Sequence, residues 1–383
     1  MSEQKQIPPP QEQQSFGSVM RYLIVLAVAG IAVYYAYFNN PVEYSAQEAK
    51  GSTMATSYSV KVRDFPKSKN VDAWSSVAEK IQRCLDDIDC RMSTFKPDSE
   101  VSRFNMSDST DWFSVSPETA EVAELALDVS RLTDGAFDIT VAPLVDCWGF
   151  GAKEQSFRQA ALPPENEINE IKKRIGFDKL SVRLNPPALK KSVPELSVDL
   201  SAIAKGYAVD CVVRLLEQLK FKNYMVEVGG EVRCRGNKGE QGSWVVGIEK
   251  PLIVPQGEFP GLWEKKLPMS DSALATSGDY QNYHTVGTVR YSHIIDPRTG
   301  YPTEKIAAGE TAPAERLGSV SVFDKDCARA DALATALFVL GEQKGLEFAE
   351  RERLPVLFLL RTDGQKPVIR EAASTEFKKL FEK

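Results

Sequence analysis

The segment SVDLSAIAKGYAVD, residues 197–210, places a carboxylate and an ammonium on either side of a short turn of small residues. Asp199 ends an apolar strand, and Lys205 with Gly206 opens an amphipathic helix. The start of a helix offers free backbone N–H groups and a positive dipole end, which suit a phosphate, and Lys205 adds a mobile cation. Asp199 could accept hydrogen bonds from the sugar or ring of a ligand. The alternative is an aspartate that caps a helix beside a solvated lysine.

A second candidate is ARADALATALFVLG, residues 328–341, whose apolar composition predicts a buried helix. Asp331 and Thr335 are four residues apart, so they share one face of that helix. A carboxylate and a hydroxyl at this spacing can supply two hard oxygens to Mg²⁺, which usually completes its octahedron with water and phosphate oxygens. The alternative is that Asp331 caps the helix and Thr335 bonds back to a carbonyl. The apolar run after Asp331 favours the metal site.

The third candidate is His293 in YSHIIDPRTGYP, residues 291–302. A strand is predicted to end at Ile295, and the turn that follows contains a proline that fixes φ and a glycine that permits positive φ. His293 would lie near the mouth of this strand, where side chains of active sites often project, although a structural role is the alternative. The chain has two histidines, so a multi-histidine zinc site is excluded.

Composition and missing motifs exclude several other classes of protein. The 383 residues include 47 basic and 53 acidic side chains, a net charge of −6, which argues against nucleic acid as a partner. Six cysteines without a C-x-x-C pair are too sparse for a disulfide scaffold. The sequence around Gly149 lacks the third glycine of a dinucleotide fingerprint, and Lys205 lacks the preceding glycine of a phosphate-binding P-loop.

An apolar stretch precedes these motifs. No charged residue occurs from Tyr22 to Val42, a length that suits one crossing of a hydrocarbon layer about 30 Å thick. Its end is bulky and aromatic and has no A-x-A site, which favours an uncleaved anchor over a cleaved signal peptide. Lys5 and Arg21 favour a cytoplasmic N-terminus, which places the rest of the chain on the outer face. We therefore expect a disordered cytoplasmic tail at 1–20, a transmembrane signal anchor at 21–39 and a linker at 40–50.

Residues 51–383 are predicted to form one mixed unit of helices and strands. Alternating patterns predict strands at 57–62, 224–228, 244–249, 286–295 and 355–360. Helical periodicity predicts helices at 73–88, 117–133, 206–219 and 330–352. Helices and strands do not alternate regularly and several strands look linked as hairpins. The fold class is therefore predicted to be α+β with a mainly antiparallel sheet.

Taken together, the motifs resemble those of the ApbE family, the FAD:protein FMN transferases. The matching segments follow the family's order and extend over nearly all of residues 51–360. They are MATSYSV (54–60), MSTFKPDSEVSRFN (92–105), DGAFDITVAPLV (134–145), VDLSAIAKGYAVD (198–210), VEVGGEVR (226–233), ATSGDY (275–280), HIIDPRTG (293–300) and ADALATALFVLG (330–341). Each segment alone is weakly specific, whereas the ordered set is highly specific.

The resemblance implies a reaction in which FAD is split at its pyrophosphate, AMP leaves, and FMN is esterified to a threonine or serine of a target protein. It implies that Asp331, Thr335 and the backbone carbonyl of Ala202 hold Mg²⁺, and that His293 is the general base. The residues implied to line the flavin and adenosine pocket are Met54, Phe95, Ala136, Phe137, Asp138, Asp199, Lys205 and Ile295.

The expected partners are FAD and an acceptor flavoprotein, a membrane or exported electron-transfer protein, with the enzyme anchored in a bacterial inner membrane and its catalytic domain in the periplasm. Family members more often carry a lipoprotein cysteine or a cleaved export signal where this chain has an uncharged span. Residues 303–318 also look longer than this connection usually is. Two other functions stay open from the residues alone: a Mg²⁺-dependent FAD pyrophosphatase, and a non-catalytic flavin-binding protein.

Overall fold

The computed structural model describes residues 23, 25–29, 43–69, 71–151, 162–239, 242–252, 261–280, 282–286, 289–303, 305–307, 315–362 and 367–382. The predicted tail at 1–20 and most of the predicted anchor at 21–39 lie outside these residues. So does half of the connection at 303–318. Within the described part of the chain, no helix has both the length and the apolar character needed to cross a membrane.

An eight-stranded sheet organises the described residues, and every neighbouring pair in it is antiparallel. The predicted α+β class with a mainly antiparallel sheet is therefore confirmed. In spatial order the strands are β1 (Tyr44–Thr53), β2 (Thr56–Pro66), β6 (Tyr224–Val228), β7 (Glu231–Arg235), β10 (Ser272–Gly278), β16 (Arg316–Asp324), β17 (Val356–Arg361) and β18 (Ile369–Ala373).

The first strand corrects the predicted linker at 40–50. Residues 44–50 belong to β1, which pairs with β2 from Tyr44 opposite Pro66 to Thr53 opposite Thr56. β1 is an edge strand, and its residues alternate between exposed and partly covered, with Ala49 the first that is fully buried. Polar residues occur on both faces of this strand, so its sequence resembles a linker although its backbone pairs with β2.

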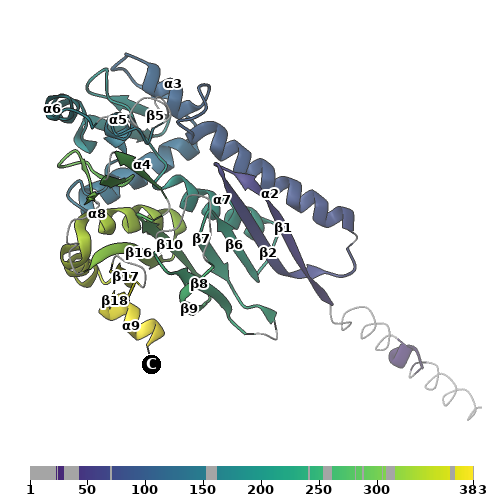
Figure 1. Cartoon of the computed structure of the whole chain (residues 1–383). Helices are drawn as coiled ribbons and strands as arrows, with labels where there is room; N and C mark the ends of the chain where they lie inside the picture. The colour runs from purple at the N-terminus through teal and green to yellow at the C-terminus, as the bar shows by residue number, and fades with distance from the viewer. Residues whose placement is uncertain are drawn as a thin grey trace, which may run out of the picture.

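Helices cover one face of the sheet. The long ones are α2 (Val71–Met92), α4 (Pro117–Leu132), α7 (Ala204–Gln218) and α8 (Cys327–Arg351), which confirm the four predicted helices. Figure 1 shows α2 running beside β1 and β2, with the short helices α3 (Glu100–Met106), α5 (Ala142–Cys147) and α6 (Glu165–Arg174) gathered at one end. The backbone of α8 is interrupted at Gly341, which has a φ of 76°.

The other face of the sheet is covered by a hairpin and a terminal helix. They are β8 (Trp244–Glu249), β9 (Trp263–Met269) and α9 (Thr375–Phe381). Strand β17 shows why both faces are apolar. Val356, Phe358 and Leu360 belong to the core under the helices, whereas Leu357 and Leu359 belong to the core under the hairpin. Alternation of side chains along a strand thus places β17 between two cores.

Smaller elements lie around this framework. The short strands are β3 (Phe113–Ser114), β4 (Leu180–Leu184), β5 (Pro187–Lys191), β11 (Tyr283–Val286), β12 (Val289–Ser292), β13 (Ile295–Asp296), β14 (Tyr301–Pro302) and β15 (Lys305–Ala307), and the 3₁₀ turns are η1 (Ile139–Val141) and η2 (Phe177–Lys179). A third apolar cluster joins α5 and α6 to β12 and β13. The strand predicted at 286–295 is therefore divided between several short strands.

Candidate active site

Helices α7 and α8 touch at Gly206, and this contact brings the two strongest sequence motifs together. A Cβ atom added at Gly206 would lie 2.4 Å from the carbonyl oxygen of Cys327, so only glycine permits this approach. The backbone N–H of Gly206 donates a hydrogen bond to Asp331 Oδ2 at 3.0 Å. This hydrogen bond ties the start of α7 to the helix that carries Asp331.

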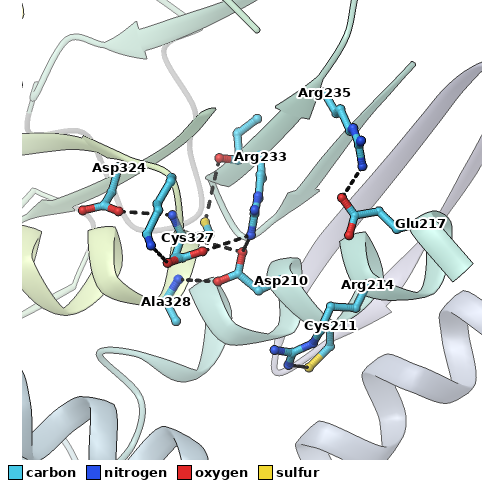
Figure 2. A network of polar contacts seen from close by, with 12 residues as sticks. Asp210, Cys211, Arg214, Glu217, Arg233, Arg235, Asp324, Cys327 and Ala328 are labelled. Carbon is cyan, nitrogen blue, oxygen red and sulfur yellow. Dashed lines mark hydrogen bonds and ion pairs between the residues drawn. The ribbon is translucent and has the colours of Figure 1, made fainter. Parts of the chain in front are cut away.

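Asp210, one turn further along α7, fixes the start of α8 (Figure 2). Its carboxylate accepts the backbone N–H of Cys327 at 3.1 Å and that of Ala328 at 2.9 Å, and it pairs with Arg233 of β7 at 2.5 Å. Burial raises the pKa of Asp210, against the effect of these N–H groups and of Arg233. A carboxylate at the N-terminus of a helix also stabilises its dipole. Sequence reasoning assigned no role to Asp210.

Lys205 lies in the first turn of α7 and is held by Glu231, the first residue of β7. Lys205 Nζ donates to Glu231 Oε1 at 2.5 Å. Burial lowers the pKa of Lys205, but the charges of Glu231 and Asp331 outweigh it and raise the pKa above its ordinary value. Lys205 is therefore an ammonium at neutral pH, as a phosphate-binding role requires. The Lys205 side chain is 31% exposed, but its ammonium pairs with a buried carboxylate, so it is not the freely solvated lysine of the alternative.

Glu231 is a site residue that sequence reasoning missed. Its side chain is 2% exposed, and its Oε2 atom has no hydrogen-bond partner among the described residues. Burial raises its pKa, and the charge of Asp331 adds to this while Lys205 opposes it. The signal was present in VEVGGEVR, where an acidic residue directly after Gly229 and Gly230 begins a strand beside the buried Val232.

Asp331 and Thr335 lie on one face of α8, as their spacing predicts. Asp331 is 3% exposed, and its carboxylate contacts α7 rather than capping α8, whose N-cap residue is Asp326. The predicted capping alternative is therefore wrong. Burial raises the pKa of Asp331, partly offset by Lys205 and the N–H of Gly206. The Thr335 hydroxyl hydrogen-bonds Ser277 Oγ on β10 at 2.8 Å.

Ala202, the third member of the implied metal set, lies half-buried in the turn that leads into α7. Among the described residues, no group of three or more His, Cys, Asp or Glu side chains is arranged to hold a metal ion. The metal set implied by the resemblance has one carboxylate, one hydroxyl and one backbone carbonyl, so it is not a cluster of three such side chains.

His293 is half-buried after β12, and its Nδ1 atom lies 2.9 Å from the carbonyl oxygen of Asn282. Because a carbonyl only accepts, Nδ1 carries the proton and Nε2 keeps a lone pair in the neutral ring. Burial lowers the pKa of His293 and Lys205 adds to this, against opposing effects of Asn282 and Asp279. The ring is thus neutral at pH 7 and is able to accept a proton.

The chain segments that carry Asp138 and Asp199 are joined through the backbone. The N–H of Asp199 donates to the carbonyl oxygen of Ile139 at 2.7 Å. Asp138, beside the buried Ala136 and Phe137, accepts from the backbone and hydroxyl of Thr140 and from the N–H of Phe177. Burial raises its pKa, against these hydrogen bonds. Asp138 therefore organises the η1 and η2 turns, and Asp199 accepts from the backbone and hydroxyl of Ser201.

The remaining predicted pocket residues come from separate places. Met54 and Ala55 form the β1–β2 turn with positive φ values of 49° and 56°. This turn is close to Lys205, because a Cβ at Gly229 would touch both Lys205 Cδ and the side chain of Thr56. Phe95 follows α2 and is 58% exposed, which is open to stacking, whereas Ile295 is 5% exposed in the third apolar cluster.

Known proteins share both the sequence and the architecture of this chain. Residues 54–358 match the ApbE family. A FAD:protein FMN transferase of Vibrio cholerae serotype O1 is 40% identical over 333 residues, which are 87% of this chain and 92% of that protein. A FAD:protein FMN transferase of Haemophilus influenzae is 38% identical over 336 residues, 87% of this chain and 90% of that protein.

Solved structures agree with the sequence matches. The flavin transferase ApbE from Vibrio cholerae has a TM-score of 0.74 and 37% identity, and the match covers 88% of this chain and all of that one. The ApbE protein from Thermotoga maritima has a TM-score of 0.72 and 29% identity over 89% of this chain. With these matches over most of its length, and with the family's motifs meeting where α7 crosses α8, this chain belongs to the ApbE family.

Proposed function

We propose that this protein is a FAD:protein FMN transferase, which splits FAD, releases AMP and attaches FMN through a phosphoester bond to a threonine or serine of an acceptor flavoprotein. The observation that carries this proposal is the hydrogen bond from Gly206 to Asp331, which fixes the first turn of α7, with its Lys205 ammonium, against the buried Asp331 carboxylate. Relatives that are 35–40% identical over more than four-fifths of this chain bear this activity in their names.

The residues at the α7–α8 crossing fit a divalent cation. The Asp331 carboxylate is buried on the same face of α8 as the Thr335 hydroxyl, and with Glu231 it gives the site two buried carboxylates against one ammonium. Hard oxygens with an excess of negative charge suit Mg²⁺. Asp331, Thr335 and the carbonyl of Ala202 would hold it. Bound there, Mg²⁺ would neutralise the pyrophosphate and the charge that develops on the departing AMP.

Two side chains of this protein then act on the reactants. Lys205 binds the pyrophosphate from the first turn of α7, where the helix dipole also favours negative charge. His293 accepts at Nε2 the proton of the acceptor hydroxyl, which is a poor nucleophile at pH 7 without a base. The Asn282 carbonyl holds the ring in the tautomer that this step requires.

The other predicted residues would shape the pocket for the two rings of FAD. Phe95 offers an exposed aromatic face for stacking, and the Met54 turn lies beside Lys205. Ala136, Phe137, Asp138, Asp199 and Ile295 would form the remaining wall. The backbone bond between Asp199 and Ile139 would hold two of these segments in register.

The test uses purified protein, FAD, Mg²⁺ and the apo form of a flavoprotein whose mature form carries FMN on a threonine. We expect the acceptor to gain the mass of one FMN while an equal amount of AMP appears. AMP and free FMN without modified acceptor would instead identify a hydrolase, and unchanged FAD would identify a binding protein. Omission of Mg²⁺ should stop the reaction.

We also propose that residues 21–39 anchor the protein in a bacterial inner membrane, with the catalytic domain in the periplasm and a membrane or exported electron-transfer protein as acceptor. Support comes from the uncharged stretch and from the exposed apolar side chains Leu23, Val25, Leu26 and Val28. Intact cells would test it: protease added after permeabilisation of the outer membrane should cut the domain. Protection until the inner membrane is lysed would contradict this orientation.

A further inference from the structure

We propose that Glu231 is a positioning residue that holds the Lys205 ammonium away from Asp331, so that the Asp331 carboxylate stays available to a divalent cation. This inference rests on the metal role proposed for Asp331. It assigns to Glu231 a task that is separate from binding the metal itself.

Lys205 lies between two carboxylates but bonds only one of them. Its ammonium contacts Glu231 Oε1 at 2.5 Å, and Asp331 acts on it as the next charge. Cys327 also lies nearby, but its pKa is raised well above the ordinary value by burial, so this thiol is neutral. Asp331 is therefore the carboxylate that Lys205 would pair with if Glu231 lost its charge.

The path of the Lys205 side chain is set by glycine. A Cβ at Gly229 would lie 3.1 Å from Lys205 Cδ, and the φ of 59° at this position also favours glycine. The gap left by Gly229 lets the lysine chain pass beside the turn and reach the start of β7. The turn therefore places Glu231 at the start of β7 and leaves room for the Lys205 side chain that Glu231 binds.

Two features of Glu231 indicate that its role is functional rather than stabilising. It is 2% exposed, and its second oxygen has no described partner, an arrangement that costs stability. Asp331 has one oxygen bound to the N–H of Gly206. An ammonium on its other oxygen would neutralise the carboxylate and block the cation. Glu231 prevents this by offering Lys205 a closer partner.

The experiment measures Mn²⁺ binding to the full-length protein by electron paramagnetic resonance, without FAD. We expect Glu231→Gln to weaken Mn²⁺ binding roughly tenfold, a coupling typical of charges in one network. Glu231→Gln combined with Lys205→Met should restore it, because the freed ammonium is gone. A purely structural loss would not be rescued by a second substitution. Melting temperatures of all variants report whether each still folds.

Two controls separate position from net charge. Glu227→Gln removes a nearby charge whose carboxylate binds the N–H of Gly230 rather than Lys205, and it should leave Mn²⁺ affinity within twofold. Glu231→Asp keeps the charge but shortens the arm, and it should weaken binding. Wild-type affinity in Glu231→Gln, together with loss in Asp331→Asn, would overturn this inference alone. Equal affinity in wild type and Asp331→Asn would overturn the metal role of Asp331 and this inference with it.

Discussion

Gly206 and Cys327 face each other where α7 packs against α8, with space for a hydrogen atom but not for a methyl group between them. A Cβ at position 206 would meet backbone atoms of Cys327 and Ala328 at 2.4–2.8 Å. Backbone atoms cannot move aside as the tip of a side chain can. The separation of the two helices, and with it the position of Asp331 relative to Lys205, therefore depends on this one glycine.

Gly206→Ala tests this contact, because the contact decides whether the substitution raises or lowers the free energy of unfolding. In an unconstrained helix the substitution would stabilise the protein by up to about 1 kcal/mol. Here we expect a loss of about 1–3 kcal/mol, because overpacking forces the helices apart. Urea unfolding measures the free energy of unfolding. A variant more stable than wild type would show that the helices do not touch at this point.

Asp210→Asn should destabilise the protein by about 1–3 kcal/mol, because a buried carboxylate that accepts two backbone N–H groups and pairs with the partly exposed Arg233 loses its charge. Asn still offers one acceptor to the start of α8, but Arg233 loses its partner at 2.5 Å and keeps the more distant Asp326 carboxylate at 3.6 Å. Chemical denaturation measures the loss. The double variant Asp210→Asn with Arg233→Met should recover part of the stability, and failure to recover any would contradict the ion pair as the cause.

His293 should make stability depend on pH. Its pKa lies below the ordinary value of 6.5 in the folded protein, chiefly because of burial, so the unfolded chain binds the proton more tightly. The contribution of His293 to the free energy of unfolding is therefore present above pH 6.5 and is lost as the pH falls through the lower folded pKa. Unfolding of wild type and His293→Gln at about pH 7.5 and about pH 5.5 measures it. A difference between them that does not change with pH would contradict a neutral His293.

Two substitutions in the β1–β2 turn should have similar effects on stability but different effects on the KM for FAD. Met54 and Ala55 both have positive φ, which favours Asn and Gly in a two-residue hairpin. Ala55→Gly should raise the free energy of unfolding by roughly 1 kcal/mol and leave the KM for FAD unchanged. Met54→Asn should also relieve strain, but it should raise the KM because Met54 belongs to the flavin pocket that we propose. An unchanged KM in Met54→Asn would remove Met54 from that pocket.

Local patterns predicted the elements that carry the chemistry. The helices with Lys205 and Asp331 and the strand at 224–228 have strong periodicity, and the structure confirms them. The spacing of Asp331 and Thr335 also placed both on one face of α8. The prediction was weakest where burial does not show in the sequence, as in the edge strand β1, whose alternation is polar on both sides.

Long-range partners could not be predicted from local patterns. Glu231 and Asp210 owe their roles to residues on other elements: Lys205 is 26 positions from Glu231, and Ala328 is 118 positions from Asp210. Nothing near Asp210 indicates that its carboxylate stabilises the start of α8. Such contacts follow from the packing of α7 against β7 and α8, and the approach to α8 depends on Gly206, whose neighbours there lie far along the chain.

The most direct test of the account is a crystal structure with Mn²⁺ and the products FMN and AMP. We predict one anomalous peak at the α7–α8 crossing, within about 2.3 Å of Asp331, Thr335 and the carbonyl of Ala202, with phosphate oxygens as further ligands and Lys205 on the phosphates. Mn²⁺ and nucleotides bound elsewhere, with the space between Gly206, Lys205 and Asp331 filled by side chains, would contradict it.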